Sequence, residues 1–161
     1  MEHGHIKLED LHRALFRSHI RPMVAADRSG CVVEWNDAAG HCLGLARERV
    51  LGRPLWEVQA SVAPATIPYE KAYSAARDTF LRLVHQSERA DRPWHLHADS
   101  DILSATGAVR HIHSEIFPVW VGSELVIVST LTDEVGCSPL ESSAAVVSPD
   151  PSESSETATA S

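Results

Sequence analysis

The chain has 161 residues, room for one domain with terminal extensions, and 43% of them are apolar, as in ordinary globular proteins. Its formal net charge of −8 argues against nonspecific binding to nucleic acid. No apolar run approaches the roughly 20 residues that cross a bilayer, and the N-terminus lacks a signal-peptide core. Three unevenly placed cysteines, Cys31, Cys42 and Cys137, favour reduced thiols. We therefore expect a cytoplasmic protein with neither nucleic acid nor membrane as a partner.

The first 21 residues predict an amphipathic helix. Leu8, Leu11 and Leu15 recur at helical spacing on one face, and Pro22 ends the pattern. This helix either packs on its own domain or forms the seam of a homodimer, and the sequence leaves both interpretations open.

Residues 22 to 58 predict a β-hairpin followed by short helices. Asp27 and Gly30 occupy the turn, where an Asp side chain bonds nearby backbone N–H groups and Gly accepts a positive φ. Asn36 stands at a helix N-cap position, and Gly44 at a C-cap position.

The remaining elements follow from periodicity. Residues 56 to 66 show little periodicity and predict a loop, and residues 69 to 88 predict a long helix. Residues 93 to 103 and 108 to 120 alternate apolar and polar side chains and predict a hairpin. The nearly continuous apolar run at 125 to 131 is typical of a central strand.

The C-terminal segment, residues 136 to 161, is rich in Ser, Ala, Pro and Glu. It holds Glu141, Asp150, Glu153 and Glu156, and residues 137 to 161 contain no Lys or Arg. Such a composition cannot bury enough apolar surface to order itself, so we expect a disordered acidic tail.

The order of these elements resembles the PAS domain, a sensory module of bacterial kinases and regulators. The matching residues are Asp27, Gly30, Asn36-Asp37-Ala38-Ala39, Gly44 and Val50-Leu51-Gly52-Arg53. The resemblance implies an α+β fold over residues 22 to 135. In it, helices cover one face of a five-stranded antiparallel sheet, and here an N-terminal amphipathic helix precedes the domain.

The resemblance also implies a function. We expect a signal-sensing and protein-interaction module for signal transduction or transcriptional regulation, acting as a homodimer or with a protein partner. We do not expect an enzyme, because the sequence has no GxSxG, GxxxxGK[ST] or HExxH motif. An alternative is a sensor fragment of a histidine kinase. The disordered acidic tail argues against it, because in the family a helix normally runs out of the Asp-Ile-Thr end. Asp133 matches that motif, but Glu134-Val135 replaces its Ile-Thr.

No cofactor is expected. Photoreceptor members of the family carry an Asn-Cys pair after the Gly-Arg, whereas Pro54-Leu55 follows Arg53 here, so flavin photochemistry is not expected. Oxygen-sensing members ligate haem iron with a His of the long helix. The matching position falls near Arg77, and the helix's own histidine, His85, lies near its end.

The interior of the predicted domain is either a filled core or a pocket for a small apolar ligand between sheet and helices. The candidate pocket residues are apolar except for two serines: Met23, Trp35, Trp56, Phe80, Leu83, Trp94, Leu96, Ile112, Ser114, Ile116, Ile127 and Ser129.

Two HxH pairs occur on the strands of the second predicted hairpin. Because side chains alternate along a strand, His95 and His97 share a sheet face with His111 and His113, and Asp99 and Glu115 lie there too. Three interpretations remain open: a polar solvent-exposed face, a zinc-type metal site, or a pH-responsive surface, because imidazole titrates near neutral pH.

Overall fold

The computed structural model describes residues 6–133, so the predicted disordered tail lies outside the described residues. The elements are α1 (Leu8–Ser18), β1 (Met23–Asp27), β2 (Val32–Trp35), α2 (Asp37–Leu43), α3 (Arg47–Val50), α4 (Leu55–Ser61), α5 (Tyr69–Arg89), β3 (Leu96–Leu103), β4 (Val109–Val121) and β5 (Glu124–Asp133). The predicted α+β architecture is confirmed, including the N-terminal helix.

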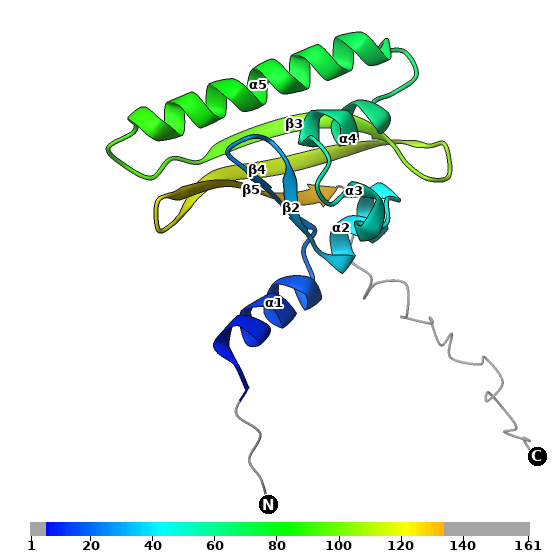
Figure 1. The fold of residues 1–161 in the computed structure, drawn as a ribbon. Coiled ribbons are helices and arrows are strands. Elements are labelled where there is room, and N and C mark those ends of the chain that lie inside the picture. Colours follow the sequence, from blue (N-terminus) through cyan, green and yellow to red (C-terminus); the bar gives the residue numbers. More distant parts are fainter. Residues whose placement is uncertain (1–5, 134–161) are drawn as a thin grey trace, which may run out of the picture.

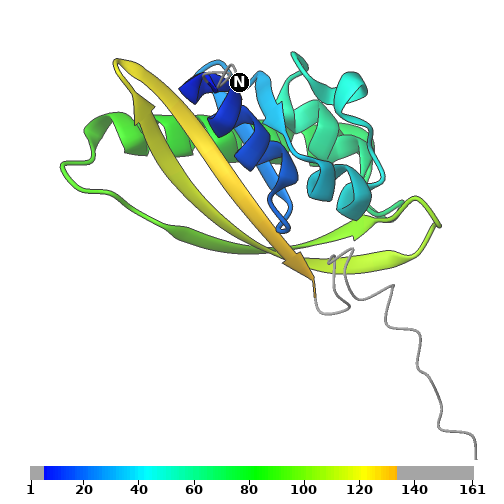
Figure 2. The same ribbon diagram turned by 90° about the horizontal axis from the view of Figure 1, so that it is seen from below.

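All neighbouring strands of the five-stranded sheet pair antiparallel, in the order β2-β1-β5-β4-β3. The central position of β5 explains why its sequence is almost continuously apolar. Helices α4 and α5 cover one face of this sheet, whereas α1 lies on the opposite side (Figure 1; Figure 2 gives the view from below). We call the face under α4 and α5 the inner face and the other the outer face.

The β1–β2 turn forms as the sequence predicts. One carboxylate oxygen of Asp27 accepts hydrogen bonds from the backbone N–H of Ser29 at 2.9 Å and of Cys31 at 3.0 Å. Gly30 has φ +88°, and the Trp56 indole lies directly against its Cα. This position therefore requires glycine for two reasons: the backbone is left-handed, and a Cβ would collide with Trp56.

Asn36 caps α2 and also ties the start of β1 to the end of β2. Its Oδ1 accepts from the N–H groups of Ala39 and Met23, both at 2.9 Å, and its Nδ2 donates to the carbonyl of Arg21 at 2.8 Å. The side chain is fully buried. The N-cap prediction is confirmed, and the bonds to Met23 and Arg21 connect the cap to the segment that leads from α1.

The prediction of a loop at residues 56 to 66 is wrong for α4. Trp56, Val58 and Ala60 are all buried in this helix. Residues two apart on a helix point in nearly opposite directions, so a short helix covered on several sides shows no amphipathic periodicity. Pro64 follows the helix and does not interrupt it.

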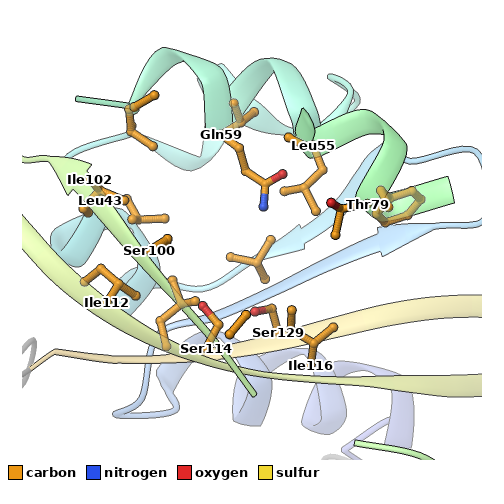
Figure 3. Close-up of a pocket in the computed structure, with 18 of the residues that line it drawn as sticks. Leu43, Leu55, Gln59, Thr79, Ser100, Ile102, Ile112, Ser114, Ile116 and Ser129 are labelled. Carbon is orange, nitrogen blue, oxygen red and sulfur yellow. The ribbon is translucent and has the colours of Figure 1, made fainter. Parts of the chain in front are cut away.

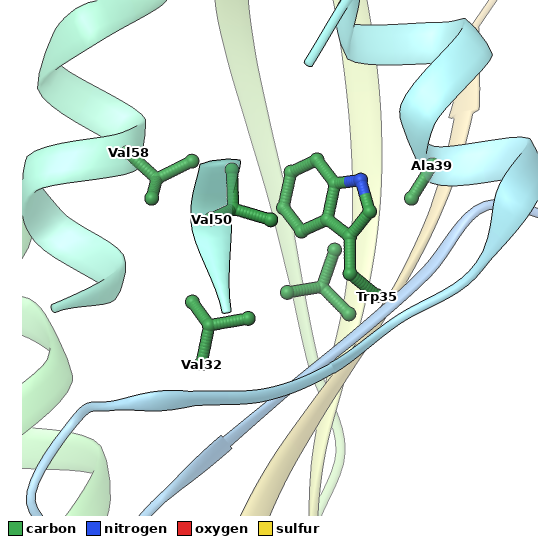
Figure 4. Close-up of a cluster of buried hydrophobic side chains, with 6 residues drawn as sticks. Val32, Trp35, Ala39, Val50 and Val58 are labelled. Carbon is green, nitrogen blue, oxygen red and sulfur yellow. The ribbon is translucent and has the colours of Figure 1, made fainter. Parts of the chain in front are cut away.

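Three apolar clusters pack between the helices and the sheet. Figure 4 shows the first, in which the Trp35 indole packs among Val32, Ala39, Val50 and Val58. The second contains Trp56 and Phe80, whose ring centroids are 5.8 Å apart. Within residues 6–133 no helix is long and apolar enough to span a bilayer.

The expectation of reduced cysteines is wrong for Cys42, which is disulfide-bonded. Cys31 is the free cysteine among the described residues. The spacing of cysteines in a sequence does not by itself show which of them are oxidised.

Candidate functional site

A cavity of about 500 Å³ lies between the inner face of the sheet and helices α4 and α5. Figure 3 shows Gln59 and Leu55 of α4 and Thr79 of α5 on one side of it, with Ser114 and Ser129 of the sheet on the other. Helix α4 packs on β1 through Val58 and Val24. Helix α5 packs on β5 through Phe80 and Ile127, so the two helices bound the cavity.

The lining of this interior cavity is mostly apolar, with a few polar groups spread around it. Its uncharged polar residues are Gln59, Thr79, Ser100, Ser114 and Ser129. The residues that line it include no Lys, Arg or His. Its acidic members are Asp99 and Asp101, and their carboxylates bond His113 and His111 on the outer face. The lining therefore offers hydrogen bonds but no positive charge.

Eight of the twelve residues predicted for the pocket line the cavity. They are Trp35, Phe80, Leu83, Ile112, Ser114, Ile116, Ile127 and Ser129. They come from α5 and from strands β2, β4 and β5. Both predicted serines lie on the inner face, where each places a hydroxyl group among apolar neighbours.

The other four predicted pocket residues lie elsewhere. Met23 pairs with Thr130 and points away from the cavity, which its neighbour Val24 lines instead. Trp56 belongs to the packed core beside Gly30. Trp94 precedes β3 and lines a smaller cavity with Pro118 and Trp120. Leu96 begins the edge strand β3 and is 39% exposed, since an edge strand has a neighbour on one side only.

Helix α4 and the segment after it also contribute to the cavity lining, which the sequence did not predict. Leu55, Val58, Gln59 and Val62 line the cavity, as does Ile67. These residues fall in or beside the stretch that was predicted to be a loop. Because α4 is buried on several sides, no single apolar face marks these residues in the sequence.

The cavity does not fit haem. Its lining holds no His, Cys, Met or Tyr that could serve as an axial ligand. Arg77 and His85, the two positions of α5 considered for that role, are both exposed. At the position where flavin photoreceptors carry the reactive cysteine, this chain has Pro54-Leu55, which leads into α4.

The histidines of the second hairpin share the outer face, as the alternation predicts. His97 pairs with Glu115, and Asp99 with His113, across β3 and β4. His95 Nδ1 lies 3.0 Å from Glu115 Oε1, and the His95 ring stacks on Phe117 with a centroid distance of 5.3 Å. We call the set His95, His97, Asp99, Asp101, His111, His113 and Glu115 the His face.

The three leucines predicted as a dimer seam are exposed. Leu8 is 64%, Leu11 42% and Leu15 58% exposed, and α1 buries none of its residues. Ile20, which follows the helix, is 58% exposed as well. Within the described chain, α1 therefore presents an apolar stripe to solvent and does not bury it against the sheet.

Comparison with known proteins places this architecture in a family. The family model of the PAS fold matches residues 11–119. None of the curated protein sequences compared with the chain matches it.

Several solved structures share the fold. The PAS domain of BvgS from Bordetella pertussis is 22% identical, with a TM-score of 0.58 and coverage of 78% of this chain and 85% of that one. A PAS domain from Colwellia psychrerythraea is 13% identical, with a TM-score of 0.55 and coverage of 79% and 97%. The PAS domain of the quorum-sensing receptor RpfR from Cronobacter turicensis, in complex with BDSF, is 15% identical, with a TM-score of 0.50 and coverage of 73% and 96%. The chain therefore belongs to the PAS family, signal-sensing modules found in histidine kinases and receptors.

Proposed function

We propose that this PAS module senses a small, largely apolar and uncharged molecule that binds in the interior cavity. The observation that carries the proposal is the cavity itself, about 500 Å³ in volume and lined mainly by aliphatic and aromatic side chains. This volume falls within the range of roughly 300–1,000 Å³ that small-molecule sites occupy. We assign the protein a sensory and not a catalytic role, in signal transduction or transcriptional regulation.

The charge of the ligand follows from the lining. A buried anionic group requires a cationic partner or several N–H donors, since an unpaired charge in an apolar site is costly. The lining residues supply an amide at Gln59 and hydroxyls at Thr79, Ser100, Ser114 and Ser129, and no cation. These groups suit a ligand with one or two neutral polar atoms on an apolar body.

One structural neighbour with the same fold is a complex with a bound molecule. The PAS domain of RpfR was solved in complex with BDSF. The shared fold makes binding within the domain a reasonable expectation here, while the chemistry of the ligand follows from this chain's own lining.

The output of the module would be a protein contact. We propose that the exposed stripe of Leu8, Leu11 and Leu15 pairs with a second copy or a partner, and that the His face contributes to the same contact. Asn36 links this stripe to the cavity, because it bonds Met23 and Arg21, and Val24 lines the cavity. A ligand that shifts β1 would thus act on the segment leading to α1.

Native mass spectrometry of the chain purified from its host tests this function. The expected result is a mass increment of one small molecule per chain, released on heating and absent after refolding. Ser129→Leu, which fills the cavity at its polar side, should abolish the increment. Thr132→Leu, an exposed residue on the same strand, is the matched control and should retain it. Equal retention by both variants would contradict the proposal.

A further inference from the structure

Two imidazoles and one carboxylate converge on the outer face of the sheet, the face opposite helices α4 and α5. One ligand atom each from Asp99, His111 and His113 lies within 4.8 Å of the others. Asp99 on β3 stands directly opposite His113 on β4, and His111 is two residues along the same strand and the same face. The rings of His111 and His113 are 5.0 Å apart at an interplanar angle of 85°.

We infer that Asp99, His111 and His113 form a surface binding site for a divalent transition metal of the zinc type. Imidazole nitrogen and carboxylate oxygen are zinc ligands, with bonds of about 2.0–2.2 Å in tetrahedral geometry. Such bonds place neighbouring ligand atoms about 3.3 Å apart. Ligand atoms that are as much as 4.8 Å apart need to approach by about 1.5 Å, and the Asp99 carboxylate has to give up its bond to His113 Nδ1. Exposed side chains achieve both by small rotations.

The donor set selects the class of metal. Two of the three ligands are nitrogen atoms, whereas calcium and magnesium prefer sites made of oxygen. The neighbourhood is also acidic, because Asp101 and Glu115 share the face with Asp99. A divalent cation is therefore attracted to this part of the sheet.

Asp101 is not one of the three proposed ligands, but it bonds His111 and so fixes the orientation of that ligand. Its Oδ1 lies 2.7 Å from His111 Nδ1. A carboxylate that accepts the Nδ1 proton fixes the ring orientation and leaves Nε2 as the nitrogen with a lone pair. This carboxylate–histidine arrangement is common behind metal-binding histidines.

The ligands come from both strands of the hairpin, so a bound metal would clamp the edge strand β3 to β4. All three ligands are exposed. Three protein ligands leave at least one coordination position for water or for a group from another molecule. Asp99 also lines the interior cavity, but its carboxylate lies on the outer face, where it bonds His113.

Calorimetric titration of the full chain with ZnCl2 tests the inference. The protein carries no polyhistidine tag, is treated with chelator beforehand, and has His3 and His5 replaced by Ala in every variant. The expected result is one zinc ion per chain. His113→Ala and His111→Ala should each weaken binding more than tenfold, and Asp101→Asn about tenfold, the size of effect typical of outer partners.

His97→Ala is the matched control, because His97 shares the face but lies outside the three-residue cluster. Its affinity should stay within twofold of the parent. Co2+ added to the parent chain gives a second readout that needs no substitution, since a four-coordinate site with nitrogen ligands absorbs visible light and loses the colour when Zn2+ displaces Co2+. Absence of this absorption, or equal zinc affinity of the parent and His113→Ala, would overturn the inference.

Discussion

Replacing Gly30 by Ala should strongly destabilise the domain, because two separate costs meet at this position. A Cβ on Gly30 would lie 2.6 Å from Cη2 of Trp56 and closer still to its Cζ3, and the backbone has φ +88°. The left-handed backbone costs an L-residue roughly 1–2 kcal/mol, and overpacking a core costs roughly 1–3 kcal/mol. Trp56 is buried against Phe80 and has little room to move away. We expect a loss of about 3 kcal/mol.

Gly107→Ala is the matched control for this prediction. Gly107 has φ +83° and nothing within 4 Å of a built Cβ, so the substitution carries the backbone cost alone. Urea unfolding followed by circular dichroism measures both variants, and a constant denaturant slope shows that the same surface is exposed on unfolding. Gly30→Ala should lose about 2 kcal/mol more than Gly107→Ala. Equal losses would refute the close packing of Trp56 on the turn.

Two further predictions concern the N-terminal connection. Asn36→Ala removes a helix cap and leaves the Met23 N–H without its partner. The free energy of unfolding should therefore fall by about 2–4 kcal/mol in the same urea assay. An unchanged urea midpoint would contradict this role of Asn36. Leu11→Glu combined with Leu15→Glu should give a folded monomer by sedimentation if the α1 stripe is a dimer seam; a parent chain that is already monomeric at high concentration would reject the seam.

The sequence predicted well those features that depend on local chemistry. The turn at Asp27 and Gly30 and the cap at Asn36 each follow from what one side chain does with nearby backbone, and both are present. The alternation along β3 and β4 also placed Asp99, His111 and His113 on one face. The two-residue repeat of a β-strand is sufficient to predict which side chains share a face of the sheet.

The features that the sequence could not predict depend on how the strands pair and on which faces of each element are buried. The MVAA run of β1 does not alternate, and Val24, Ala25 and Ala26 are all buried, so nothing local indicated that Met23 faces outward. Helix α4 is covered on several sides and carries no amphipathic pattern. The convergence of three ligands needed the register of Asp99 opposite His113, which is set by long-range pairing.

The neutral fluorescent probe N-phenyl-1-naphthylamine tests whether the interior cavity binds an uncharged amphiphile. We expect the probe to bind the parent chain and Thr132→Leu alike, and Ser129→Leu at least tenfold more weakly. We also expect 1-decanol to displace the probe at lower concentration than decanoate, because the lining holds no cation. Probe binding that is unchanged in Ser129→Leu, or stronger competition by decanoate, would contradict the binding of an uncharged amphiphile in this cavity.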